Sequence, residues 1–138
     1  MRDKTGLRED LDLKIIEKNC LSTVFDILEV HGIGHAGGSL SILQMLVSLY
    51  FEVACVNPCD PKWPGRDRII LSKGHACEAM YSVLAERGYF PKEKIKQYLE
   101  FGSIFQGHTE TFTPGVEYSA GSSGRVSLLP VELPMQRS

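Results

Sequence analysis

Residues 66–76 read Arg-Asp-Arg-Ile-Ile-Leu-Ser-Lys-Gly-His-Ala, a short apolar run followed by a polar turn. The three consecutive apolar residues, 69–71, include two β-branched side chains and predict a strand buried on both faces. Gly74 relaxes the backbone where the strand ends, and a helix is expected to follow at once. His75 should therefore project from the carboxyl end of a strand, where open α/β sheets bind ligands, and it is the first candidate functional residue.

Three further histidines lie beside glycines in the sequence: His31, His35 and His108. Histidines in glycine-flanked turns are typical of loops that recognise ligands, more than of a packed core. The alternative for His75 is a polar residue that starts a helix and bonds only to its own loop. The additional histidines favour a functional cluster over that alternative.

Composition indicates one domain of ordinary globular character. The chain has 138 residues, of which 43% are hydrophobic and 23% charged, and its net charge is -2. A length of this order allows a sizeable core. The charge gives no basic surface for a polyanion, so nucleic acid is excluded as an expected partner.

The cysteines predict a reducing compartment. Cys20, Cys55, Cys59 and Cys77 show no paired C-x-x-C spacing, so we interpret them as reduced thiols that are mostly packed. The amino terminus has no apolar signal region, and no run approaches the length of a membrane span. These features favour a cytoplasmic protein without a membrane partner.

Apolar periodicity predicts four helices, which cover about 8–30, 39–53, 76–87 and 91–101. Gly32 is expected to end the first helix, and Ser39 to cap the second, whose few polar residues predict burial. Gly88 and Gly102 are expected to end the third and fourth. Trp63 is interpreted as a packing anchor.

The stretch 103–123 shows neither helical nor strand periodicity and is punctuated by glycine and proline. A structureless stretch of this length inside a compact domain is usually functional or disordered. Because it carries His108, we favour a functional loop.

Six short motifs, taken in sequence order, resemble the beginning of transketolase, and the resemblance covers roughly residues 11–125. The motifs are 34–41 (Gly-His-Ala-Gly-Gly-Ser-Leu-Ser), 60–64 (Asp-Pro-Lys-Trp-Pro), 66–68 (Arg-Asp-Arg), 71–76 (Leu-Ser-Lys-Gly-His-Ala), 107–108 (Gly-His) and 114–117 (Pro-Gly-Val-Glu). The second motif and the short amino terminus look more like the split transketolases of bacteria and archaea. In those enzymes the N-terminal cofactor domain is a separate polypeptide.

The resemblance implies a function and its cofactors. The family transfers a two-carbon ketol unit between sugar phosphates, as in the pentose phosphate pathway, with thiamine diphosphate held by a divalent metal such as Mg²⁺ at a dimer interface. The implied partners are therefore sugar-phosphate substrates, a C-terminal transketolase subunit and a homodimer mate.

The resemblance also implies roles for particular residues. It places the catalytic candidates His35 and His108 beside the donor-sugar hydroxyls, and His75 near both the cofactor diphosphate and the substrate. Imidazole titrates near neutrality and can exchange protons with hydroxyls, which suits such roles. Gly121 and Ser123 belong to a segment that offers backbone groups to thiamine diphosphate. His31 matches no ligand position of the family and is interpreted as a helix-end residue.

The chain departs from the family pattern near its end. Ser123 stands where the family has leucine, and Val126 where it has glycine. The Gly-Asp-Gly segment that holds metal and diphosphate is absent, so no metal ligand is expected in this chain. We expect residues 1–125 to be the N-terminal part of the cofactor domain and 126–138 an aberrant, disordered tail.

The expected fold class is therefore α/β, the N-terminal part of a thiamine diphosphate-binding fold. In this chain it should be mostly helical, with few strands of the parallel sheet. The leading function is a transketolase portion that is inactive alone. Two alternatives stay open: a non-functional truncated product, and a binding module for sugar phosphate without catalysis.

We predict that the tail 126–138 arises from a frameshift. Suitable codons for it, after restoration of one G, encode Arg-Gly-Leu-Ser-Leu-Ala-Cys-Gly-Ala-Ala-Tyr-Ala-Ala-Lys, an alanine-rich helix with the family's glycine after arginine. Resequencing of the locus checks this prediction. Codons that are incompatible with the restored frame would contradict it.

Overall fold

The computed structural model describes residues 12–120 and 122–129, the last stretch by its backbone alone. In chain order the elements are α1 (Leu13–His31), α2 (Ala36–Ser48), the π-helical η1 (Leu49–Val53), β1 (Arg68–Lys73), the 3₁₀ turn η2 (Gly74–Ala76), α3 (Cys77–Arg87), the 3₁₀ segment η3 (Lys92–Gln97) and β2 (Ser122–Leu129).

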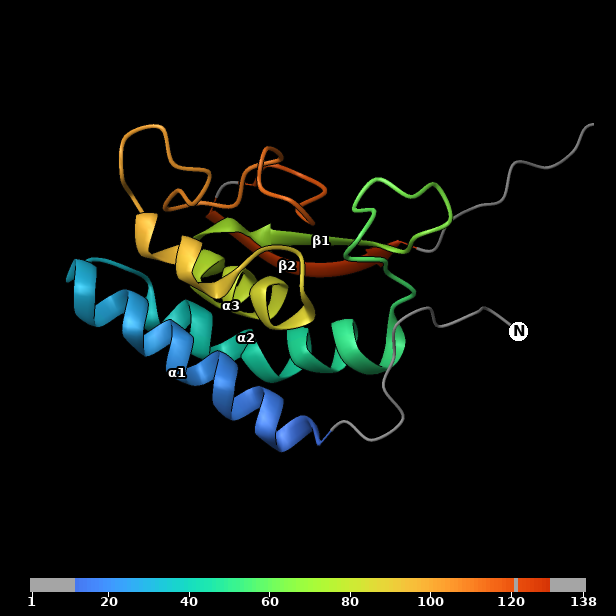
Figure 1. Cartoon of the computed structure of the whole chain (residues 1–138), viewed down its shortest axis with the longest axis horizontal. Coiled ribbons are helices and arrows are strands. Elements are labelled where there is room, and N and C mark those ends of the chain that lie inside the picture. Colours follow the sequence, from blue (N-terminus) through green and yellow to red (C-terminus); the bar gives the residue numbers. More distant parts are fainter. Residues whose placement is uncertain (1–11, 121, 130–138) are drawn as a thin grey trace, which may run out of the picture.

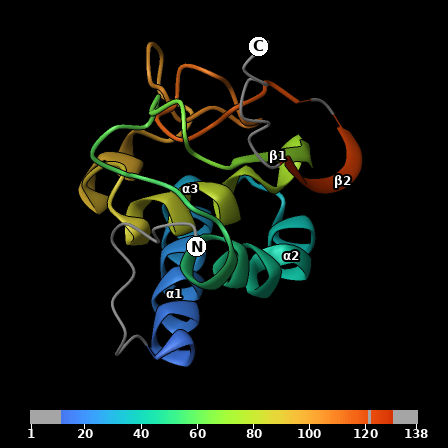
Figure 2. The ribbon, with the colours of Figure 1, turned by 90° about the vertical axis from the view of Figure 1, so that its right-hand side faces the viewer.

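The elements form a helical layer, a strand pair and a layer of loops (Figure 1). Helices α1, α2 and α3 pack against one another in all three pairs. The view turned by 90° shows the loops of 99–120 on the opposite side of the strands from α1 and α2 (Figure 2). The fold is α/β and mostly helical, as the sequence predicts.

The first and third helices end where predicted, but the first begins at Leu13 and not near Arg8. Helix α1 is capped by the Asp12 carboxylate, which accepts the backbone N–H of Lys14 at 2.9 Å. It ends at Gly32, whose φ of 62° is left-handed, and α3 ends at Gly88 with φ 104°. Glycine adopts this conformation without the steric cost that a Cβ would add, so both predicted helix ends are confirmed.

The second helix begins earlier than predicted, at Ala36, and Ser39 is not its cap. Ser39 is fully buried inside the helix, and its hydroxyl turns toward α3. Gly37 and Gly38 both belong to the helix. Gly38 packs closely on His75, because a Cβ at Gly38 would lie 2.8 Å from Cδ2 of that ring, whereas a Cβ at Gly37 would meet nothing. Close approach therefore explains Gly38 alone.

Strand β1 is buried on one face, and the prediction of two buried faces was wrong. Ile69 and Leu71 are buried, whereas Ile70 between them is half-buried. Its partner is β2, which runs antiparallel and pairs Arg68 with Leu129 and Lys73 with Ser122. The described residues therefore form a two-stranded antiparallel sheet, and the expected strands of a parallel sheet are not found among them.

The tail expected from residue 126 is only partly described. Residues 126–129 belong to β2, so their backbone is more regular than we expected. Residues 130–138 lie outside the described part of the chain. The domain boundary after Arg125 stays a prediction.

The fourth predicted helix is instead the 3₁₀ segment η3, preceded by Pro91 in an extended conformation. Among its six residues only Ile95 is buried, and the others are charged or polar. A longer α-helix here would bury only one apolar side chain against the core. That burial contributes too little free energy to stabilise the helix, which explains the short 3₁₀ segment.

The loop 103–120 contains no helix or strand but is anchored by buried side chains. Glu117 forms a bidentate ion pair with Arg66, with Nε–Oε1 and Nη2–Oε2 distances of 2.6 and 2.8 Å. Arg66 also donates to the carbonyl oxygen of Trp63, whose ring packs over Gly65. The ion pair raises the pKa of the Arg66 guanidinium and ties this loop to the turn before β1.

The continuous segment Ala36–Val53 is long and apolar enough to cross a membrane by length and composition alone, although the sequence had suggested no such run. It packs in the core through Leu46, Val47 and Tyr50. These contacts favour a core helix over a membrane span.

The thiols are unpaired and mostly packed, as predicted. All four thiols are free, and three of them, Cys20, Cys55 and Cys77, are buried. Burial raises the pKa of Cys20 and of Cys77 to about 12, so both thiols are protonated at neutral pH.

We expect Phe105→Ala to lower the free energy of unfolding by about 3–5 kcal/mol, because it empties a packed aromatic site. Phe105 is fully buried, and its ring centroid lies 5.2 Å from that of Tyr81 and 4.9 Å from that of Phe90. Phe101→Ala, at a fully exposed position, is the matched control and should change little. Urea unfolding measures both; equal effects would show that this loop is not packed as described.

Candidate functional site

Three imidazoles from distant parts of the chain lie together. The ring centroid of His35 is 5.4 Å from that of His75 and 6.0 Å from that of His108. His35 and His108 are exposed, and His75 is half-buried. The structure thus brings together three of the four glycine-flanked histidines, the same three to which the resemblance to transketolase gives catalytic roles.

A different local structure positions each imidazole. His75 lies in η2, directly after β1, as the sequence predicts, and His35 immediately precedes α2. His108 is held through its backbone, since its carbonyl oxygen accepts the Tyr81 hydroxyl at 3.1 Å. The next residue, Thr109, donates its backbone N–H to the carbonyl oxygen of Gly74 at 3.3 Å, which joins this loop to η2.

A cation lies next to His75. Lys73 precedes it by two residues, and its ammonium donates to the Ser41 hydroxyl at 2.8 Å. Burial lowers the pKa of His75, and the neighbouring charges of Lys73, His35 and His108 lower it further, while Glu78 opposes them. The neutral imidazole is therefore favoured, and it can accept a proton.

Beneath the imidazoles lies a fully buried carboxylate, Glu78, in the first turn of α3. Its Oε1 accepts the backbone N–H of His35 at 3.0 Å and the hydroxyl of Tyr98 at 2.7 Å. Its Oε2 accepts the hydroxyl of Ser39 at 2.7 Å. One carboxylate therefore joins the start of α2, the start of α3 and the end of η3.

The Glu78 carboxylate is ionised in this setting. Burial alone would raise its pKa, but the hydrogen bonds from Ser39, the His35 backbone and Tyr98 outweigh burial and lower it. The backbone of Gly34 approaches this carboxylate closely: a Cβ at Gly34 would lie 2.7 Å from Oε1 and would also collide with the side chain of Leu28. No larger residue fits at Gly34 without displacing the carboxylate.

Sequence reasoning did not select Glu78, Ser39 or Tyr98 as functional residues. Each looked like an ordinary polar or amphipathic residue of a helix. The available signal was the buried helix itself: eight consecutive residues of α3, Cys77 to Leu84, are buried, and an acid within such a run requires partners.

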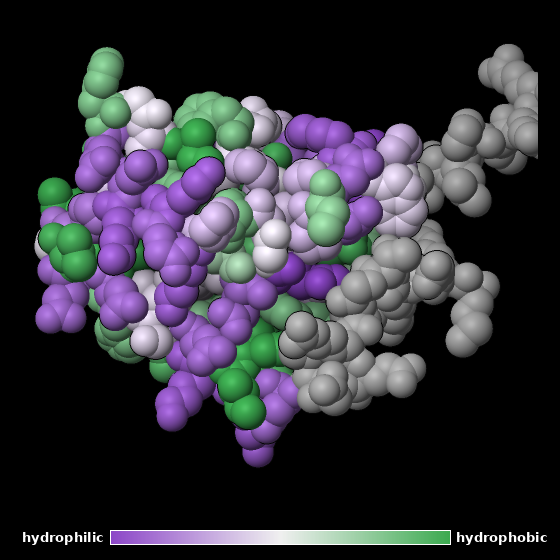
Figure 3. Space-filling model, viewed as in Figure 1, coloured by the Kyte–Doolittle hydropathy of each residue, from purple (hydrophilic) through white to green (hydrophobic). Residues whose placement is uncertain are grey.

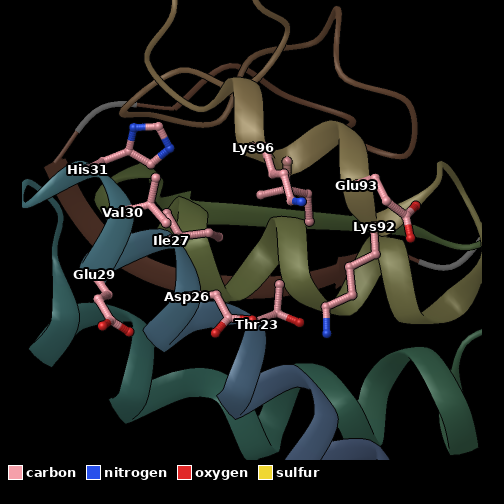
Figure 4. A pocket seen from close by; sticks show the side chains of 10 residues that line it. Thr23, Asp26, Ile27, Glu29, Val30, His31, Lys92, Glu93 and Lys96 are labelled. Atoms are coloured by element: carbon pink, nitrogen blue, oxygen red, sulfur yellow. The ribbon is translucent and has the colours of Figure 1, made fainter.

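His31 ends α1, as predicted, and stays apart from the imidazole cluster. Its ring meets that of Tyr98 edge-on, with centroids 5.4 Å apart. It also lines a cavity of about 370 Å³ between α1 and η3. Figure 4 shows apolar side chains such as Val30 lining this cavity, with Lys92 and Lys96 entering from η3.

The predicted cofactor segment is only partly described. Gly121 lies outside the described residues, and Ser123 is described by its backbone alone. Ser122 pairs with Lys73, so this segment starts beside the end of β1, close to the turn that carries His75. Within residues 12–120 no group of three or more His, Cys, Asp or Glu side chains could hold a metal.

The sequence profile described as "Transketolase, thiamine diphosphate binding domain" matches residues 14–128. The chain belongs to the transketolase family. The three imidazoles and the segment that leads into β2 all lie within the matched region.

Relatives of the transketolase family include separate subunits. The chain is 43% identical over 95 residues to the 6-deoxy-6-sulfo-D-fructose transketolase subunit of Clostridium sp., covering 68% of this chain and 34% of the relative. It is 44% identical over 91 residues to an apulose-4-phosphate transketolase subunit of Phocaeicola vulgatus, covering 66% of this chain and 32% of the relative. The chain thus spans about a third of the length of these relatives.

Solved transketolases share the fold. The transketolase of Leishmania mexicana superposes with a TM-score of 0.75 at 32% identity, covering 80% of this chain and 17% of that one. The expectation of the N-terminal part of a thiamine diphosphate-binding α/β fold is thereby confirmed.

We expect Lys73→Met to raise the pKa of His75 toward its ordinary value of 6.5, because the substitution removes a neighbouring positive charge. The lowered pKa also means that the folded state disfavours the charged imidazole. Above pH 6.5 the imidazole is neutral in both the folded and the unfolded state, so it does not reduce stability. As the pH falls below 6.5, protonation favours the unfolded state and the free energy of unfolding decreases.

Nuclear magnetic resonance titration of the ring protons measures the shift. Lys96→Met, which removes an equal charge from η3, is the control and should leave His75 unchanged. A pKa of His75 that does not move in Lys73→Met would contradict the described arrangement.

Proposed function

We propose that this chain forms the substrate- and cofactor-facing N-terminal part of a transketolase that transfers a two-carbon ketol unit between sugar phosphates. The observation that carries the proposal is the group of three imidazoles from three separate segments, with centroids 5.4 and 6.0 Å apart. These imidazoles lie in the region that matches the family profile of the transketolase thiamine diphosphate binding domain. The relatives named as subunits support a separate partner subunit and sugar-phosphate substrates.

The residues present suit the anionic and hydroxyl-bearing groups of such ligands. His75 and the ammonium of Lys73 lie side by side where an anion such as a diphosphate would be attracted. Next to His108, the Thr109 hydroxyl is buried and has no hydrogen-bond partner within the described residues, so a group that reaches the interior there would find an unused donor and acceptor. The backbone of Gly121 and Ser123 would complete the cofactor contact.

The chemistry divides between cofactor and chain. Thiamine diphosphate, when bound, supplies the nucleophilic carbon that this chain lacks. His35 and His108, both exposed, are assigned to the hydroxyls of the donor sugar, where imidazole can accept and return a proton. His75, with its lowered pKa, is assigned to proton acceptance and hydrogen bonding at the boundary between cofactor and substrate.

The proposed enzyme also requires a metal ion and a partner subunit. We assign Mg²⁺ to residues elsewhere in the complete enzyme, as the resemblance to the family implies. Exposed aromatic side chains in the loop layer, Phe101, Phe112 and Tyr118, suit association with a second subunit. Hydrophobic side chains also interrupt a mostly hydrophilic face of the molecule (Figure 3). We place the enzyme in the cytoplasm.

We expect the isolated chain to show neither tight thiamine diphosphate binding nor ketol transfer. In contrast, a chimera in which residues 12–120 replace the matching segment of the Leishmania mexicana transketolase should be active. Calorimetry with thiamine diphosphate and Mg²⁺ and an assay with ketose and aldose phosphates measure both. A chimera that folds and binds the cofactor but never turns over would contradict the proposed function, and micromolar Mg²⁺-dependent binding by the isolated chain would contradict its inactivity.

In the same chimera, His108→Ala should lower turnover by roughly two to four decades, because general acid and base groups typically contribute this much. Its cofactor affinity should change far less, since the assigned partner of His108 is the sugar. Thr111→Ala, at an exposed position on the same loop, is the control and should keep normal turnover. Unchanged turnover in His108→Ala would remove His108 from the mechanism.

A further inference from the structure

Glu78 has no assigned role in the proposed chemistry, yet its buried carboxylate bonds directly to the backbone of His35. The side chain is fully buried and accepts three hydrogen bonds that span 43, 39 and 20 positions of sequence. Burial of an ionised carboxylate is costly unless such partners compensate it. A residue that served only to fill the core would be better replaced by an apolar side chain.

The hydrogen bonds of Glu78 act on the residue that carries one imidazole. Its Oε1 accepts the backbone N–H of His35 itself, and its Oε2 accepts Ser39, one turn into α2. The backbone of Gly34 lies directly over Oε1. The segment that carries His35 is therefore fixed from below by the carboxylate at several neighbouring points.

The third hydrogen bond fixes the carboxylate. Tyr98 donates to Oε1 at 2.7 Å from the end of η3, and it is itself buried. Thus the carboxylate has a defined orientation, with Oε1 shared between Tyr98 and His35 and Oε2 turned to Ser39. The position of His35 relative to His75 depends on this orientation, since His75 lies only three residues before Glu78 in the chain.

We propose that Glu78 is a positioning residue: its buried carboxylate holds the start of α2 against the start of α3 and so keeps the His35 ring beside the His75 ring. Its importance for ketol transfer rests on the proposed function, but the geometry it maintains does not. Glu78 is assigned no contact with substrate or cofactor and acts through His35.

The test uses the whole chain without ligands and compares Glu78→Gln with Glu86→Gln. Both remove one negative charge from α3, but Glu86, near the end of that helix, accepts an exposed hydrogen bond from Asn19 and lies outside the cluster. Ring-proton nuclear Overhauser contacts between His35 and His75 report the geometry, and the titration of His75 reports the charge. The charged groups that face His75 are Lys73, His35, His108 and Glu78.

In Glu78→Gln we expect the contact between the rings of His35 and His75 to be lost. We also expect the pKa of His75 to fall further, because the substitution removes the negative charge that raises it. Glu86→Gln should change neither. A folded Glu78→Gln with an unchanged ring contact and an unchanged titration would overturn the proposal.

If Glu78→Gln fails to fold, the variants Ser39→Ala and Tyr98→Phe test the proposal instead, because each removes a single hydrogen bond to the Glu78 carboxylate. A weakened contact between the rings of His35 and His75 in these variants supports the proposal, and an unaltered contact overturns it. None of these readouts requires cofactor or turnover. A chimera without ketol transfer would therefore contradict the proposed function while leaving this inference intact.

Discussion

The hydrogen bonds accepted by the Glu78 carboxylate join segments that are far apart in the sequence. Because the group is buried, its partners must stay in place or leave a charge without compensation in a medium of low polarity. The start of α2, the start of α3 and the end of η3 are thereby fixed relative to one another. The exposed imidazole of His35 lies on this fixed base, so a flexible-looking glycine-rich turn is held in one arrangement.

The loop layer is positioned by a second set of contacts. Tyr81, on α3, donates to the backbone of Gln106 and His108, and Thr109 donates to Gly74. At its far end the loop is tied to the turn before β1 by Arg66 and Glu117. Helix α3 thus supports two of the three imidazoles from one element, His35 through Glu78 and His108 through Tyr81. This arrangement explains why a long stretch without regular structure is nevertheless packed.

The sequence predicted features that depend on local chemistry. Apolar runs and glycines predicted strand β1, the turn at His75 and the glycine ends of α1 and α3. The glycine-flanked turns marked all four histidines alike, and the resemblance to transketolase was needed to set His31 apart. The sequence could not predict features that depend on distant partners. Ser39 looked like a helix cap because its target, Glu78, lies 39 positions away, and the antiparallel pairing of β1 depends on which extended segment is close enough in space.

The central claim is tested most directly by a crystal structure of the complete enzyme containing this chain, with thiamine diphosphate and a ketose phosphate bound. We expect ring nitrogens of His35 and His108 to lie within hydrogen-bond distance of sugar hydroxyls, and His75 to lie between sugar and cofactor. A structure in which the domain keeps the fold described here while both ligands bind away from all three imidazoles would contradict the claim.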